Sequence, residues 1–125
     1  VMVQNGEPLL IDMDTLCIGH PVFELASMYN AFVGYSEIDP PNTLKFFGYT
    51  FETAGKIWNS SLKTYLGTDD EHLCQSVAEK AMIIGYVRMM RRAIRRPDNA
   101  DSAIRIARCR EMLVELLPKV DSLIF

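Results

Sequence analysis

Residues 9–14 read Leu-Leu-Ile-Asp-Met-Asp, an apolar run that ends in two carboxylates. Because the run is too short for a helix, it predicts a buried strand that ends in charge. Just upstream, Asn5-Gly6 separates Val1-Met2-Val3 from this run, and Asn-Gly is typical of a type I′ turn because both residues tolerate positive φ. The sequence therefore predicts a β-hairpin that carries Asp12 at its far end.

Asp12 and Asp14 are two residues apart, so on a continuing strand their side chains share one face. Two carboxylates on one side of a strand end suit Mg²⁺, which proteins usually hold with one or two carboxylates together with waters and substrate phosphates. The alternative is a strand that runs into a turn, where each Asp bonds nearby backbone amides. The spacing alone leaves both interpretations open.

A longer pattern extends the run: Ile11-Asp12-Met13-Asp14, then Gly19-His20-Pro21, then Phe23-Glu24-Leu25-Ala26. It resembles the segment after the catalytic loop of aminoglycoside phosphotransferase and choline kinase-like enzymes, which have a protein-kinase-like fold. These families read roughly I-D-[FW]-[EG], a short loop, G-D-P and then x-x-D-L-A, and the spacing matches without a gap. The resemblance implies a transferase that moves the γ-phosphoryl group of ATP to a hydroxyl of a small polar acceptor.

The resemblance also implies roles for individual residues. Asp12 matches the Asp of the D-F-G motif, which holds the Mg²⁺ that bridges the nucleotide phosphates, and Asp14 would have a weaker, supporting metal role. Gly19, His20, Pro21 and Glu24 match a structural loop, but His20 and Glu24 each replace an Asp of the family. We expect these two changes to alter local hydrogen bonding without loss of chemistry.

Other family parts are missing from this sequence. The catalytic loop, roughly H-G-D-x-x-x-x-N, would lie upstream of Val1, so no catalytic Asp is present, and neither is the nucleotide-binding lobe with its glycine-rich loop. We therefore expect a fragment, the helical C-terminal lobe of such an enzyme with a short N-terminal β-hairpin. ATP and Mg²⁺ would serve the complete enzyme, and the chain alone would bind neither and be inactive.

Length and composition fit an ordinary globular protein. The chain has 125 residues, of which 49% are hydrophobic and 23% charged. We expect one mainly α-helical domain over residues 1–125, with the hairpin and metal-binding loop in 1–20 and helices in 21–125. No apolar run reaches the roughly 18 residues of a membrane span. Three widely spaced cysteines fit a reducing cytosol, so we expect a cytoplasmic protein.

Apolar spacing of three and four residues predicts five helices. Pro21 suits the first turn of the first helix, and Thr68 with Glu71 forms a capping box before the fourth. The predicted helices are Val22–Val33, Thr43–Tyr49, Phe51–Leu66, a long one from the capping box to Arg96, and one from Asp98 or Asn99 to Leu117.

Residues 34–42 form a loop by composition. In related phosphotransferases, insertions between helices shape the acceptor site, so Tyr35 and Glu37 are candidates to contact a substrate amine or hydroxyl. The alternative, which the composition favours, is a solvated connector.

Charge is unevenly distributed. Residues 1–87 hold four Lys, no Arg and 11 acidic residues, whereas residues 88–125 hold nine basic and five acidic residues. The basic run comprises Arg88, Arg91, Arg92, Arg95 and Arg96, with Arg105, Arg108 and Arg110 following. It is either a phosphate or nucleic-acid patch or a solvated helix face. The second interpretation is favoured, with the run paired to Asp98, Asp101, Glu111 and Glu115, because the whole chain is acidic.

A different class of function is also open. The chain could be a non-catalytic helical binding or self-assembly module derived from the kinase fold. Apolar surface that a nucleotide lobe normally covers would then join copies into a homo-oligomer, through the Val1–Ile11 hairpin or the apolar Val120–Phe125 tail. The expected partners are thus a small-molecule acceptor in the complete enzyme or a second copy of the chain. Nucleic acid is the least favoured, and no membrane partner is expected.

Overall fold

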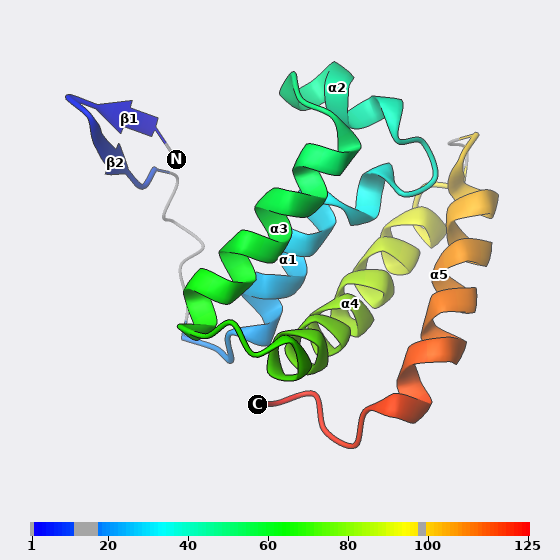
Figure 1. Cartoon of the computed structure of the whole chain (residues 1–125). Coiled ribbons are helices and arrows are strands. Elements are labelled where there is room, and N and C mark those ends of the chain that lie inside the picture. Colours follow the sequence, from blue (N-terminus) through cyan, green and yellow to red (C-terminus); the bar gives the residue numbers. More distant parts are fainter. Residues whose placement is uncertain (1, 12–17, 98–99) are drawn as a thin grey trace.

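A computed structural model describes residues 2–11, 18–97 and 100–125. These residues are mainly α-helical, with a short N-terminal antiparallel hairpin (Figure 1). The strands are β1 (Met2–Gln4) and β2 (Glu7–Leu9). The helices are α1 (Val22–Phe32), α2 (Pro41–Phe47), α3 (Phe51–Leu66), α4 (Glu71–Ile94) and α5 (Ser102–Leu116), and the short 3-10 helices are η1 (Gly34–Ser36) and η2 (Leu117–Lys119).

The hairpin has the predicted turn. Asn5 and Gly6 have φ values of 55° and 84°, as a type I′ turn requires, and Gln4 pairs with Glu7 beside it. The prediction of a buried strand was wrong, because Val3 is 73% and Leu10 64% exposed. Figure 1 shows the hairpin apart from the helices, so α1 does not pack beneath it. The strand also lies earlier than predicted, because β2 pairs beside the turn and ends at Leu9, so Leu10 and Ile11 of the apolar run follow it.

The helices lie beside one another in the order α3, α1, α4, α5 (Figure 1). α4 is central, because it packs on α1 along one side and on α5 along the other. Trp58 of α3 is buried and meets Tyr29 of α1 edge-on, with ring centroids 5.6 Å apart. The largest fully buried side chains are Tyr86, Met89, Val22, Val77, Thr43 and Cys109.

The predicted and observed helix boundaries agree best where the sequence offers a single capping signal. α3 has the predicted bounds: Thr50 accepts a hydrogen bond from the Thr53 amide at its start, and Gly67 ends it. α2 begins at Pro41 instead of Thr43, because a proline is well suited to the first helical position. The predicted loop 34–42 is therefore shorter and contains η1.

The capping box of Thr68 and Glu71 was a wrong prediction. α4 begins at Glu71, and its cap is Asp70, whose Oδ1 accepts from the amides of His72 at 2.9 Å and Leu73 at 3.2 Å. Thr68 instead accepts from the Asp70 amide at 3.1 Å, as in a turn. The Asp70 carboxylate is two residues closer to the helix than the Thr68 hydroxyl, so it accepts from the first free amides of the helix in place of that hydroxyl.

The fifth helix also starts later than predicted. Its first residue is Ser102, with Asp101 as cap, while the predicted starts Asp98 and Asn99 lie outside the described residues. The Ser102 hydroxyl donates to the carbonyl oxygen of Arg96 at 2.7 Å. This bond ties the end of α4 to the beginning of α5.

Gly85 allows α1 and α4 to approach closely. The Asn30 side-chain amide of α1 donates to the Gly85 carbonyl at 3.1 Å. A Cβ on Gly85 would lie 2.7 Å from Asn30 Oδ1 and 3.2 Å from a ring carbon of Tyr29. A glycine is therefore required at this crossing.

Replacing Gly85 by Ala is expected to destabilise the chain by about 1–3 kcal/mol, because overpacking at the crossing outweighs the better helix propensity of Ala. Gly55→Ala in α3 is the matched control, since a Cβ there meets nothing within 4 Å. This second change should stabilise by about 0.5–1 kcal/mol. Urea unfolding of both variants measures the difference, and equal shifts of the same sign would contradict the close crossing.

Candidate functional site

The predicted metal residues Asp12 and Asp14 lie outside the described residues. The structural loop that follows them is described from residue 18 and leads directly into α1. Pro21 precedes the helix, and its carbonyl accepts from the Leu25 amide at 2.9 Å. Gly19 is exposed, and Glu24 is exposed in the first turn of α1, where a carboxylate complements the positive end of the helix dipole.

His20 connects the start of α1 to the C-terminal tail. Its Nδ1 accepts the Val22 amide hydrogen at 3.2 Å, and its Nε2 lies 3.1 Å from the main-chain oxygen and 3.4 Å from the amide nitrogen of Phe125. The Phe125 ring meets the imidazole edge-on at 4.9 Å, and Lys80 donates to the Ile124 carbonyl at 2.8 Å. His20 thus supplies an acceptor to the helix start and also holds the tail on the helices.

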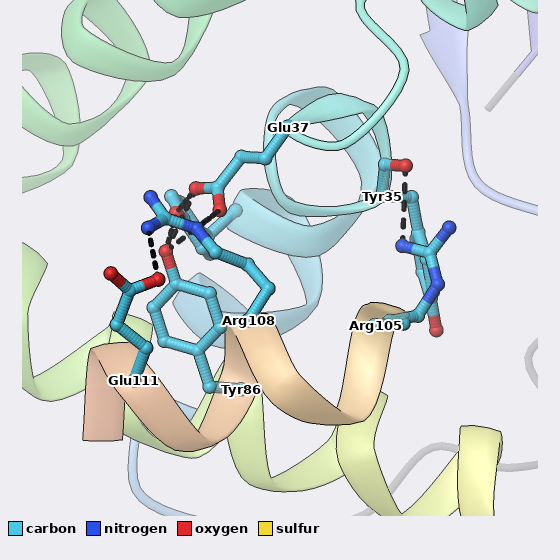
Figure 2. Close-up of polar contacts among 7 residues, drawn as sticks. Tyr35, Glu37, Tyr86, Arg105, Arg108 and Glu111 are labelled. Atoms are coloured by element: carbon cyan, nitrogen blue, oxygen red, sulfur yellow. Dashed lines mark hydrogen bonds and ion pairs between the residues drawn. The ribbon is translucent and has the colours of Figure 1, made fainter. Parts of the chain in front are cut away.

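Glu37 lies in a buried polar cluster and does not form a solvated connector (Figure 2). Its side chain is only 14% exposed. The Tyr29 hydroxyl donates to Glu37 Oε1, and the Tyr86 hydroxyl donates to the same carboxylate at 2.8 and 3.0 Å. Arg108 of α5 forms an ion pair with it, with Nε 3.7 Å from Oε2. The carboxylate therefore links α1, α4 and α5 to the segment after η1.

The two tyrosines are strongly held in their neutral form. Burial raises the pKa of Tyr29, and the neighbouring negative charge of Glu37 raises it further. Burial likewise raises the pKa of Tyr86, with Glu37 adding to the rise while Tyr29 and Arg108 act against it. The two hydroxyl oxygens also lie 2.8 Å apart, within hydrogen-bond distance, so both tyrosines and the carboxylate form one connected network.

Tyr35, the other predicted acceptor residue, lies beside arginines. The guanidinium of Arg92 is 5.8 Å from the centre of its ring and that of Arg105 is 5.5 Å, within the range of a cation–π interaction. Arg105 also donates to the Tyr35 carbonyl at 3.3 Å (Figure 2). Tyr35 and Glu37 are therefore both held by α5, and contact of either with a substrate stays a prediction.

Two adjoining cavities surround Tyr35, and we call them together the arginine groove. The first has a volume of about 450 Å³ and lies between α1 and the end of α4, and the second, of about 490 Å³, extends to α2 and α5. Tyr35, Arg92 and Arg96 line both cavities. Four more arginines line one or the other: Arg88, Arg91 and Arg95 in the first and Arg105 in the second.

The predicted acidic partners of the arginines are confirmed in one case. Glu111 accepts from Arg108 at 2.9 Å, whereas Glu115 pairs with Lys119 at 2.8 Å. Asp98 lies outside the described residues, and within residues 2–11, 18–97 and 100–125 none of the five arginines from 88 to 96 forms an ion pair. The described contacts therefore support a paired face at Arg108 and not at the five arginines from 88 to 96.

Sequence reasoning missed the Glu37 cluster, because its members come from four separate segments. Tyr29 and Tyr86 each lie among apolar residues in the sequence, and nothing local shows that both hydroxyls meet one carboxylate. A tyrosine at a buried position of each helix was the signal that could have indicated the cluster, since a buried hydroxyl needs a hydrogen-bond partner.

Neither a metal cluster nor a membrane helix occurs in the part of the chain that the structure describes. No three His, Cys, Asp or Glu side chains gather there as metal ligands. No described helix combines the length and apolar character needed to cross a membrane. Comparison with known protein families, curated proteins and solved structures gave no significant match.

Proposed function

We propose that this chain is the helical C-terminal-lobe part of an ATP-dependent small-molecule phosphotransferase, which transfers the γ-phosphoryl group to a hydroxyl acceptor. The single observation that carries the proposal is the ungapped pattern Ile11-Asp12-Met13-Asp14, Gly19-His20-Pro21 and Phe23-Glu24-Leu25-Ala26. In this proposal Asp12 binds Mg²⁺, with Asp14 in support. Bound Mg²⁺ would neutralise charge on the nucleotide phosphates.

The order of elements around the pattern supports the proposal. A two-residue turn folds β1 onto β2 directly before Asp12, and α1 starts at Val22, directly after Gly19-His20-Pro21. His20 supplies a helix-start acceptor through Nδ1, a task that the Asp of related enzymes can perform with its carboxylate. The His substitution is therefore compatible with an intact loop.

Exposed apolar side chains on the hairpin are a second line of support. Met2, Val3, Leu9, Leu10 and Ile11 are all at least 44% exposed. Apolar surface gathered on a two-stranded hairpin is typical of a contact with more polypeptide. In the proposed enzyme, the nucleotide-binding lobe and catalytic loop, which come from outside residues 1–125, would cover it.

Transfer of radioactive phosphate from γ-labelled ATP tests the proposal. The native polypeptide that contains this chain is purified from its source and incubated with Mg²⁺ and a panel of hydroxylated amines, cholines and sugars. Labelled product with at least one acceptor, absent without Mg²⁺, is the expected result. No labelled product with any acceptor, from a polypeptide that contains an upstream catalytic loop, would reject the proposal.

The same exposed hairpin favours a second candidate, a self-assembly module. In this case the 125-residue chain is expected to form a dimer or larger species above its 14.2 kDa mass, because copies cover one another's apolar strands. Light scattering measures the mass. Replacing Val3 and Leu10 by Lys should restore the monomer, whereas the control changes Ile104→Lys and Val114→Lys, at exposed positions of α5, should not. A strictly monomeric parent chain at high concentration would remove this candidate.

A further inference from the structure

Five arginines lie at the C-terminal end of α4 and just after it. Arg88, Arg91 and Arg92 have the spacing i, i+3, i+4, which places their side chains along a single face of the helix. They lie in its last two turns, where the dipole favours cations, and Arg95 and Arg96 directly follow its last residue, Ile94. Like charges three and four residues apart nevertheless repel one another, so the cluster opposes helix formation unless an anion is near.

Contacts to other helices hold part of this face in place. Arg88 donates to the Ser27 hydroxyl at 2.7 Å and to the Phe23 carbonyl at 3.3 Å, both in α1. Arg92 lies over the Tyr35 ring, and Arg105 reaches the same residue from α5. The guanidinium groups at both ends of the groove are therefore positioned by uncharged partners, and no described acidic residue pairs with them.

The groove also contains an acceptor without a partner. Asn30 is 5% exposed and lines the first cavity, and its Oδ1 has no hydrogen-bond partner among the described residues. Its Nδ2 is occupied by the Gly85 carbonyl. Burial of an unpaired amide oxygen is unfavourable, and a functional site is one setting in which proteins retain such a group.

We infer that the arginine groove binds a phosphorylated small molecule, with the phosphate groups held by the arginines at the end of α4 and just after it. Guanidinium groups suit this role because their donors match phosphate oxygens in pairs. Six arginines line the two cavities, and none of them is in an ion pair with a described residue. A polyanion supplies the missing negative charge.

The second cavity indicates what the rest of the ligand is like. Phe46 and Phe47 of α2 line it together with Ala31 and Ala93, and Phe46 is 72% exposed. An aromatic or apolar group attached to the phosphate would reach these rings while the phosphate contacts Arg92 and Arg96, which line both cavities. The expected ligand is thus an aromatic or apolar phosphate ester.

The concave shape favours a small molecule over nucleic acid. Each cavity, at about 450 and 490 Å³, has the size of an ordinary small-ligand pocket. None of the lining residues belongs to residues 11–26, which carry the phosphotransferase proposal. The two proposals can therefore fail separately.

Calorimetric titration of the 125-residue chain with inorganic pyrophosphate and with 2-naphthyl phosphate tests the inference. Both are expected to bind at a one-to-one ratio, more weakly as salt increases because the contacts are ionic. Arg91→Gln with Arg95→Gln should weaken both by at least about tenfold, since charge-assisted hydrogen bonds are lost. Neither side chain has a partner among the described residues, so the fold should be preserved.

The matched control removes two charges outside the groove, with Arg110→Gln and Lys56→Gln, and should change affinity by less than about twofold. Phe46→Ser should weaken the binding of 2-naphthyl phosphate and leave the affinity for pyrophosphate unchanged. Absence of saturable binding at about 1 mM ligand, or equal weakening by the control, would overturn the inference. Tighter binding of a short DNA duplex, lost in the Arg91 and Arg95 variant, would overturn it in favour of nucleic acid.

Discussion

Replacing Asp12 by Ala in the complete polypeptide is expected to lower the rate of phosphoryl transfer by at least about 10³-fold. In the proposed enzyme this carboxylate binds the Mg²⁺ that neutralises the nucleotide phosphates, and metal-ion stabilisation of a phosphoryl-transfer transition state amounts to several kcal/mol. Initial rates at saturating ATP and acceptor measure the change. Because the lost interaction forms with the reacting phosphates, kcat should fall whether or not KM changes.

Two further variants serve as comparisons for the Asp12→Ala variant. Asp14→Ala should lower the rate less, because its expected role is to support the metal. Glu24→Gln should leave the rate within about twofold, since that exposed carboxylate only complements the start of α1. Near-normal turnover of the Asp12→Ala variant, in an enzyme shown to require Mg²⁺, would reject the assignment of Asp12.

Local signals predicted most of the secondary structure, because those signals depend on neighbours in sequence. Asn5-Gly6 predicted the turn, and the apolar spacing before Gly67 predicted α3 with its bounds. The same kind of reasoning failed at the start of α4. Thr68 and Asp70 are both suitable N-cap residues, and the sequence does not show which of them caps the helix. Burial of the 9–11 run was also mispredicted, since hydrophobicity shows what tends to be covered but not what covers it.

The polar contacts of the candidate sites were less predictable, because their partners lie far apart in sequence. Arg108 was expected on a solvated face, yet it is 3.7 Å from Glu37, which is 71 positions away. The basic run of α4 was visible in the sequence, but its position beside Tyr35 and α2 depends on how η1 and α5 pack. Charge and spacing predicted which residues share a helix face, whereas only the tertiary structure shows what that face contacts.

Alkaline pH is expected to destabilise the chain steeply through Tyr29 and Tyr86. Burial and the Glu37 carboxylate raise the pKa of both hydroxyls, so they stay protonated in the folded state. In the unfolded chain they ionise near the ordinary tyrosine value of about 10. Below this pH both states are protonated and the contribution is fully present. Above it unfolding releases protons, and the free energy of unfolding falls by up to about 1.4 kcal/mol per pH unit for each tyrosine.

Urea unfolding between about pH 8 and 11.5 measures this slope. Tyr86→Phe should reduce the slope by the contribution of one tyrosine. It should also lower the free energy of unfolding by about 1–3 kcal/mol at neutral pH, because Glu37 loses a buried donor. Tyr65→Phe is the matched control, since Tyr65 is 54% exposed and should leave the slope unchanged. Burial also raises the pKa of the Cys109 thiol, which adds a loss that begins at lower pH in every variant. The difference between the parent chain and Tyr86→Phe therefore isolates the tyrosine effect, and identical slopes would mean that the buried cluster does not hold the hydroxyl protonated.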